Sequence, residues 1–232
     1  MDREPEPGSP YESRAEAIAF TTGIQRRLLA RIERRFVADV LRSCAEPKRK
    51  VLDLGTGPGW IPIQLKKARP EWEVTAVDAS RHMLDIARVG AQAEGVSIRW
   101  VRARAEDTGL PPDEFDLVLS HYLLHEVGSA SDMMAEAVRI TKGGGLLIVE
   151  DAERSPSWRW PLTLLFLGVY YAFTPLMRQQ AIHSTRAAYR ADELARLLRD
   201  PRLASLEVVT HWKSLTALVR VTAKKREGIR KA

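Results

Sequence analysis

The sequence predicts a single α/β domain in which a mostly parallel sheet is covered by helices on both faces. Two observations favour this fold class. Short apolar strands alternate with helical stretches from about residue 50 to residue 150, and a glycine-rich turn follows the first of these strands. The chain of 232 residues suffices for one well-buried domain and leaves little for a second.

The first expected element is a long helix from about residue 14 to residue 43. It carries arginines around an apolar stripe that contains Leu28, Ile32 and Phe36. The arginines are Arg26, Arg27, Arg31, Arg34 and Arg35. This pattern predicts an amphipathic helix that packs its stripe and leaves its arginines in solvent, and anion binding is the alternative.

The remaining elements alternate in type. Strands are expected near residues 50–54, 72–77, 97–102, 115–120 and 144–150, with helices at about 59–68, 81–93 and 130–141. After residue 150 the order changes to an apolar insert, a helix near 191–199 and two strands at 206–212 and 215–222. Because only a short turn separates these two strands, they are expected to form an antiparallel hairpin.

The glycine-rich turn predicts a binding loop. Gly55, Gly57 and Gly59 allow the backbone to turn sharply and allow a ligand to approach without meeting a Cβ atom. Pro58 suits a first helical position, so the next helix is expected to begin near it. The spacing differs from the Gly-x-Gly-x-x-Gly pattern of dinucleotide-binding proteins.

Two acids stand at the ends of the first two strands. Asp53, two residues before the first glycine, would oppose a pyrophosphate but suits a ligand that carries an ammonium or sulfonium cation. Asp78 ends the second strand, where a carboxylate can accept hydrogen bonds from both hydroxyls of a ribose. The pair predicts a ligand with a nucleoside and a cationic group.

At these residues the chain resembles the class I S-adenosylmethionine-dependent methyltransferases, especially the small-molecule group that includes the ubiquinone and menaquinone methyltransferases. The resemblance covers roughly residues 51–150. Its motifs are residues 51–59, 76–80 with Met83-Leu84, 115–120, 123–127 and 140–146. The resemblance implies a three-layer, Rossmann-like sheet of seven mostly parallel strands with a reversed last strand, and S-adenosyl-L-methionine as the cofactor.

The chain departs from the family pattern at two places. Gly143 stands where proline is usual, and Arg104 stands where an acid accepts the adenine amino group. Arginine cannot accept that bond. Either Glu106 or Asp107 takes the role, with Glu106 favoured, or the adenine is held by backbone groups and by packing against Met83 and Ala105.

The resemblance also implies the cofactor-binding residues. Asp53 and the glycines would hold the amino-acid end, and Ser120 would face the methyl end. An aromatic residue of the N-terminal arm, Tyr11, would close over the cofactor. The full expected set is Tyr11, Asp53, Gly55, Thr56, Gly57, Gly59, Asp78, Ala79, Met83, Ala105, Glu106 and Ser120.

The candidate catalytic residues are histidines, because an acceptor hydroxyl must lose a proton and imidazole titrates near neutrality. His121 follows the fourth strand, at the edge where the acceptor is expected, and His183 follows the insert. The alternative for His121 is a hydrogen bond that only orders its loop. His125 matches a family position that is expected to support the site without touching the acceptor. No metal site is expected.

The apolar insert is expected to belong to the methyltransferase domain, over residues 154–185 of a domain that spans 14–223. Residues 160–177 carry no charge and are bracketed by Arg159 and Arg178. We expect a lid over a greasy acceptor; an interfacial helix and core or homodimer packing are the alternatives. Prolines and a glycine shorten its helical part, which disfavours a membrane span.

The charge distribution and the N-terminal sequence indicate where the protein acts in the cell. The net charge is +6, with an acidic arm over residues 1–13 and a basic tail over 224–232. The arm lacks the apolar core of a signal peptide, and the single cysteine, Cys44, suits a reducing cytoplasm. Peripheral membrane contact through the insert and the tail is the alternative to a purely cytoplasmic protein.

The expected function is methyl transfer to oxygen or carbon of an apolar small molecule that is quinone-, phenol- or lipid-like. The segment after the fourth strand lacks the Asn/Asp-Pro-Pro-Tyr/Phe motif of enzymes that methylate an amine, so nucleic acid is not expected as a substrate. Two alternatives stay open. One is a degenerate protein that binds the cofactor as a partner or sensor, and the other is a nucleotide-dependent oxidoreductase.

Overall fold

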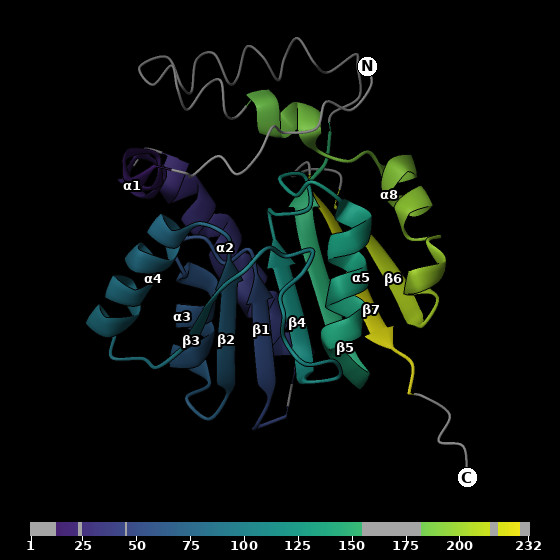
Figure 1. Cartoon of the computed structure of the whole chain (residues 1–232), viewed down its shortest axis with the longest axis horizontal. Coiled ribbons are helices and arrows are strands. Elements are labelled where there is room, and N and C mark those ends of the chain that lie inside the picture. The colour runs from purple at the N-terminus through teal and green to yellow at the C-terminus, as the bar shows by residue number, and fades with distance from the viewer. Residues whose placement is uncertain (1–12, 23–24, 45, 155–181, 214–217, 228–232) are drawn as a thin grey trace.

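A computed structural model describes residues 13–22, 25–44, 46–154, 182–213 and 218–227. Tyr11, the uncharged stretch 160–177 and the last five residues of the expected basic tail lie outside the described residues. The described part forms one sheet with helices on both sides (Figure 1).

The sheet has seven strands in the order β3-β2-β1-β4-β5-β7-β6. Neighbouring strands from β3 to β5 run parallel, and β7 runs antiparallel to both β5 and β6. The seven-stranded sheet with a reversed last strand is therefore confirmed. The strands are β1 Lys50–Leu54, β2 Glu73–Asp78, β3 Arg99–Arg102, β4 Phe115–His121, β5 Thr141–Ala152, β6 Leu206–Lys213 and β7 Leu218–Lys225.

The first helical region differs from the prediction. In place of one helix over 14–43, the structure has two, α1 Arg14–Thr22 and α2 Gln25–Ser43. The hydroxyls of Thr21 and Thr22 both donate to the Ile18 carbonyl at 2.9 Å, and such side-chain bonds compete with the helix's own backbone bonds. Gly23 follows at once in the sequence and disfavours continuation of the helix.

The later helices lie close to their predicted positions. They are α3 Trp60–Ala68, α4 Arg81–Ala93, α5 Ala130–Ile140 and α8 Ala191–Leu197. The third of the expected glycines, Gly59, precedes α3 in the left-handed conformation, so this helix begins at Trp60 and leaves Pro58 in the turn. The side chains of Ser80 and Ser129 cap α4 and α5 by accepting from backbone N–H groups.

Alternation along the central strands produces two apolar cores. Leu52, Leu54 and Val118 belong to the core on the side of α5 and α8. Val51 and Leu117 belong to the core on the other side, beneath α2 and α3. Because successive strand residues point to opposite faces, each central strand is buried on both sides. Residues at the ends of these strands are thereby held in fixed positions along one edge.

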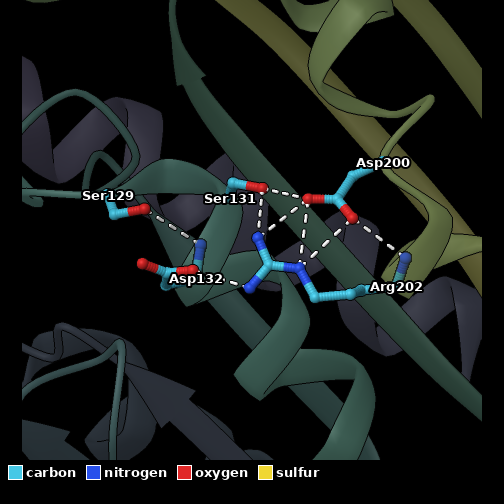
Figure 2. Close-up of polar contacts among 5 residues, drawn as sticks. All are labelled: Ser129, Ser131, Asp132, Asp200 and Arg202. Carbon is cyan, nitrogen blue, oxygen red and sulfur yellow. Dashed lines mark hydrogen bonds and ion pairs between the residues drawn. The ribbon is translucent and has the colours of Figure 1, made fainter.

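A polar cluster fastens the segment after α8 to the beginning of α5 (Figure 2). The Arg202 guanidinium donates to Asp132 at 2.6 Å, to Asp200 at 2.8 Å and to Ser131 at 2.7 Å. The Ser129 hydroxyl accepts from the Asp132 backbone N–H at 3.2 Å. The hydrogen bonds from Arg202 and Ser131 hold the pKa of Asp200 well below its usual range.

We expect Arg202→Met to lower the free energy of unfolding at pH 7, by an amount that shrinks as the pH falls below about 4. A carboxylate whose pKa is lowered by folding contributes stability above its unfolded pKa of about 3.9 and loses it on acidification. Urea unfolding at pH 7 and at about pH 2.5 measures the difference. Arg199→Met, at an exposed residue after α8, is the matched control. If Arg202→Met lowered the free energy of unfolding equally at both pH values, packing and not charge would hold the segment after α8 against α5.

Candidate active site

The three glycines of the turn after β1 adopt positive φ angles for different reasons. Their φ angles are 69° at Gly55, 53° at Gly57 and 79° at Gly59. A Cβ at Gly55 would lie 2.5 Å from the Leu123 side chain, and one at Gly59 would lie 2.7 Å from the Ala87 Cβ. A Cβ at Gly57 would meet nothing within 4 Å. Gly55 and Gly59 therefore allow close packing, whereas Gly57 faces the space into which a ligand can approach.

Asp78 organises the turn from the end of β2. Its Oδ2 accepts from the Gly57 N–H at 2.7 Å and its Oδ1 accepts from the Ser80 N–H at 2.8 Å. Burial raises the pKa of this carboxyl, and these two backbone bonds offset part of the rise. Each carboxylate oxygen keeps a second lone pair. Asp78 can therefore hold the glycine turn and still accept from a ribose hydroxyl.

Asp53 is buried beneath the turn, with 1% of its surface exposed. Burial raises its pKa to about 7; Thr56 opposes the rise, and Asp78 and Glu33 add to it. Its Oδ2 has no hydrogen-bond partner among the described residues. A buried acid with an unpartnered oxygen is costly unless a cationic or donor group joins it.

Further buried polar atoms near the ends of β1 and β4 are also unpartnered within the described chain. They are Thr56 Oγ1, Ser120 Oγ and His121 Nε2. Ser120 pairs with Leu54 across the two strands, and β1 and β4 meet where the order of the sheet reverses. Ligands of open α/β sheets bind at this switch point. The Asp53 Oδ2 and the Thr56 and Ser120 hydroxyls fit the amino-acid end of S-adenosylmethionine, which carries an ammonium and a carboxylate, whereas the His121 Nε2 faces Glu150.

The residues expected at the adenine are buried or already hydrogen-bonded. Met83 and Ala105 are buried at 1% and 7% exposure. The Glu106 Oε1 already accepts from the Arg104 guanidinium and from the Gly128 N–H, both at 3.0 Å. Glu106 thus ties the segment after β3 to the loop after β4, and its role as adenine acceptor stays a prediction.

His121 lies on the face of the sheet that α2 covers. Its ring centroid is 4.7 Å from that of Phe36, and its Nε2 is 3.6 Å from the Glu150 Oε1. Arg220 of β7 donates to Glu150 and to Asp39, each at 2.6 Å. Burial alone would raise the pKa of Glu150, but the imidazole and the guanidinium lower it below its usual value. His121 is therefore part of a buried charged network that joins three strands to α2.

A second histidine forms a tighter pair. The Nδ1 of His125 lies 2.5 Å from the Oδ1 of Asp151, and the His125 backbone N–H donates to Oδ2 at 3.1 Å. One carboxylate thus holds both the ring and the backbone of His125, and both residues are at 2% exposure. A ring whose Nδ1 is held by a carboxylate has Nε2 as its basic nitrogen, and here Nε2 lies 4.0 Å from the Glu126 Oε1.

The sequence interpretation placed His125 in a supporting role and did not single out Asp151. The signal was present, since Asp151 lies near the end of the fifth parallel strand, beside the strand that His121 ends. Carboxyl ends of neighbouring parallel strands share one edge of the sheet, so an acid there can meet a histidine from the next loop. Spacing along the chain does not reveal this pairing.

The loop that carries His125 is held in a strained conformation. Tyr122 has a φ of 57°, which is uncommon for a residue other than glycine, and its N–H donates to the Glu150 carbonyl at 2.8 Å. The next side chain, Leu123, occupies the space beside Gly55. The histidine loop and the glycine turn are therefore in direct contact.

His183 lies in a short helical segment at residues 182–187 and is exposed. Ala79 follows the end of β2, and its contact with the cofactor stays a prediction. Within the described ranges, no group of three His, Cys, Asp or Glu side chains could hold a metal ion. Of the helices that the structure describes, none combines the length and the apolar character that crossing a bilayer requires.

The sequence of this chain is similar to those of known methyltransferases. Residues 51–145 match the profile of a methyltransferase domain family. Over these residues the chain is similar to a methyltransferase domain. Demethylmenaquinone methyltransferase of Thermus thermophilus is 35% identical over 103 residues, which are 44% of this chain and 46% of that protein. The ubiquinone/menaquinone biosynthesis C-methyltransferase of Desulfotalea psychrophila is 34% identical over 102 residues, 44% of this chain and 41% of its own length. The matches thus span less than half of these relatives.

Solved structures extend this likeness to the whole fold. A SAM-dependent methyltransferase from Aquifex aeolicus superposes with a TM-score of 0.66 at 18% identity, covering 92% of this chain and 98% of that one. The plantazolicin methyltransferase BamL, solved with S-adenosylhomocysteine, has a TM-score of 0.65 at 14% identity and coverages of 92% and 96%. The first of these proteins is described as SAM-dependent and the second was solved with S-adenosylhomocysteine, so both are linked to the same cofactor.

Proposed function

We propose that this chain transfers a methyl group from S-adenosylmethionine to oxygen or carbon of an apolar small molecule that is quinone-, phenol- or lipid-like. The orphaned buried Asp53 carboxyl beneath an open glycine turn is the observation that carries the cofactor assignment. The names of the menaquinone and ubiquinone relatives support the acceptor class. The protein would act in the cytoplasm, and peripheral contact with the membrane that holds such acceptors is the alternative.

In this proposal each part of the cofactor has its own residues. Asp53 holds the ammonium, and Gly57 leaves room for the amino-acid chain. Asp78 accepts from the ribose, and Met83 with Ala105 packs on the adenine, with Glu106 as its acceptor. Tyr11 and the uncharged stretch 160–177, which lie outside the described residues, would cover the cofactor and the acceptor.

The bound cofactor supplies a methyl group that is already activated by the sulfonium. The protein must then align the acceptor, exclude water and remove a proton when the acceptor carries one. His121 and His183 remain candidates for the base, but the held Nδ1 of His125 makes this residue the better one. Its Nε2 would take the proton, and Asp151 would stabilise the imidazolium.

The test is titration calorimetry of the full chain with S-adenosylmethionine, S-adenosylhomocysteine and NAD, on the native protein and on Gly57→Ala. We expect micromolar affinity for the first two and none for NAD. Gly57→Ala should still fold, because its Cβ meets no atom and the left-handed φ of 53° costs an alanine only about 1–2 kcal/mol. It should bind at least tenfold more weakly because its Cβ enters the ligand space.

Thermal unfolding of Gly57→Ala separates loss of binding from loss of fold, and Gly59→Ala is the contrasting variant because its Cβ would collide with Ala87. Binding of NAD alone would favour the oxidoreductase. Binding of S-adenosylmethionine without turnover over quinols, phenols and lipids would favour a cofactor-binding partner or sensor, for which the Arg104 substitution is the leading clue.

A further inference from the structure

The outer side of α2 carries a row of arginines, three of which have no partner among the residues that the structure describes. Arg31, Arg34 and Arg35 are exposed, and none has a hydrogen bond or ion pair with another described residue. Arg42, two turns further on, is 71% exposed although it pairs with Asp39. Residues three, four and seven apart lie on one side of a helix, so these side chains form a continuous row about 17 Å long. We call these four residues the arginine ridge.

The acids of the same helix lie on its inner side. Asp39 is 15% exposed and binds Arg220 of the sheet at 2.6 Å. Glu33 is half-buried and contributes to the raised pKa of Asp53. The helix therefore separates its charges, with acids turned toward the sheet and arginines turned toward solvent.

On other helices, exposed arginines form ion pairs with acids of the same helix. On α4, Arg88 pairs with Asp85 at 2.9 Å, and on α8, Arg196 pairs with Asp192 at 2.8 Å. In both cases the acid lies on the same exposed surface and offsets the positive charge. The arginine ridge lacks this compensation along three of its four members, so it presents a concentrated positive field.

The ridge lies on the helix that also borders the candidate site. Phe36, on the inner side of α2, contacts the His121 ring at 4.7 Å. In Figure 1, α1 lies beside α4, at the end of the sheet toward which the parallel strands run. The Phe20 ring of α1 stacks on the Trp60 ring, which follows the glycine turn, with the ring centroids 6.3 Å apart. A surface bound along the ridge would be separated from the site by one helix.

We propose that the arginine ridge is an electrostatic docking surface for an anionic phospholipid membrane. The choice of a lipid surface rests on the proposed apolar acceptor, which partitions into bilayers, and arginines on an amphipathic helix match anionic headgroups. The guanidinium suits phosphate because it donates two parallel hydrogen bonds. Docking would bring the site to the place where its acceptor is concentrated.

The experiment is flotation of the full chain with vesicles of 30% phosphatidylglycerol in phosphatidylcholine, and with phosphatidylcholine alone, at low and high salt. We expect binding only to the anionic vesicles and release by salt. The triple variant R31Q/R34Q/R35Q should partition on the order of a hundredfold more weakly, since each arginine near such a surface is worth about fivefold.

The matched control is R88Q/R196Q/R199Q, which removes the same charge from other exposed surfaces and should retain most of the binding. Equal loss in both triple variants would show that net charge and not the ridge is responsible, and undiminished binding of R31Q/R34Q/R35Q would also overturn the proposal. Binding of a duplex DNA is measured on the same proteins. If R31Q/R34Q/R35Q lost affinity for the DNA but kept its binding to vesicles, the ridge would be assigned to nucleic acid. S-adenosylhomocysteine binding, measured on the same samples, tests the proposed function separately.

Discussion

Asp53→Asn should make the protein more stable at pH 8 and weaken cofactor binding at the same time. Burial raises the pKa of Asp53 to about 7, so between about pH 4 and pH 7 the unfolded chain releases a proton that the folded chain retains. Native stability therefore falls as the pH rises through this window, by about 4 kcal/mol in total. Asparagine does not titrate, so its advantage should be near zero at pH 4 and largest above pH 7.

The measurement is urea unfolding of both proteins at pH 4, 6 and 8. Asp78→Asn is a useful comparison because it also removes a buried carboxylate but disturbs the hydrogen bond to Gly57. It should therefore lower stability at neutral pH where Asp53→Asn raises it. A constant difference between Asp53→Asn and the native protein at all three pH values would contradict a raised pKa at Asp53.

Asp53→Asn, which should raise stability, should weaken cofactor binding. A bound ammonium would favour the ionised carboxylate, so binding near pH 6 should release a proton, seen as a dependence of the calorimetric heat on the buffer's protonation enthalpy. Asp53→Asn should abolish this release and weaken S-adenosylhomocysteine binding by about ten- to a hundredfold, the value of a hydrogen bond to a charged group. Unchanged affinity and no proton release would show that the ammonium lies elsewhere.

His125→Gln should lower the rate of methyl transfer to a hydroxyl acceptor by a factor of about 10² to 10⁴, the usual value of a positioned base. Affinity for S-adenosylhomocysteine should change little, because the glycine turn and Asp78 remain. Raising the pH should restore part of the rate, since the acceptor then ionises without help. Initial rates with radiolabelled cofactor and a phenol or quinol, between pH 6 and pH 10, measure this.

Three further variants show whether the effect belongs to His125. Asp151→Asn should lower the rate and move the pH profile, because the amide no longer stabilises the imidazolium. His121→Gln and His183→Gln should retain most of the rate. If His121→Gln lost the rate and His125→Gln kept it, the base would be His121 and the pair of His125 with Asp151 would only hold the loop.

The fold class could be predicted from the sequence because the features that indicate it are formed by residues close together in the chain. Apolar runs of strand length, the turn with Gly57 and the acid at Asp78 each depend on neighbouring residues. The break after Thr22 was missed because the apolar stripe continues through it, whereas the competing bonds to the Ile18 carbonyl appear only in the structure.

The candidate site was less accessible because its contacts cross strands. Glu150 lies between His121 on one side and Arg220 on the other, and this arrangement requires the last strand to insert beside β5. No pattern along the chain indicates that register. The same holds for His125 with Asp151, and for Glu106 with the Gly128 N–H.

The position of β7 has a consequence for biosynthesis. β6 is made before β7, yet β7 lies between β5 and β6, so the sheet cannot be completed in the order in which the ribosome delivers its strands. Until Arg220 emerges, Glu150 and Asp39 lack the cation that joins them, and the hydrogen-bonding edge of β5 is open. A nascent chain that has completed β5 would therefore expose a pairing edge until its final strand arrives, which makes this interval the one in which a chaperone would matter most.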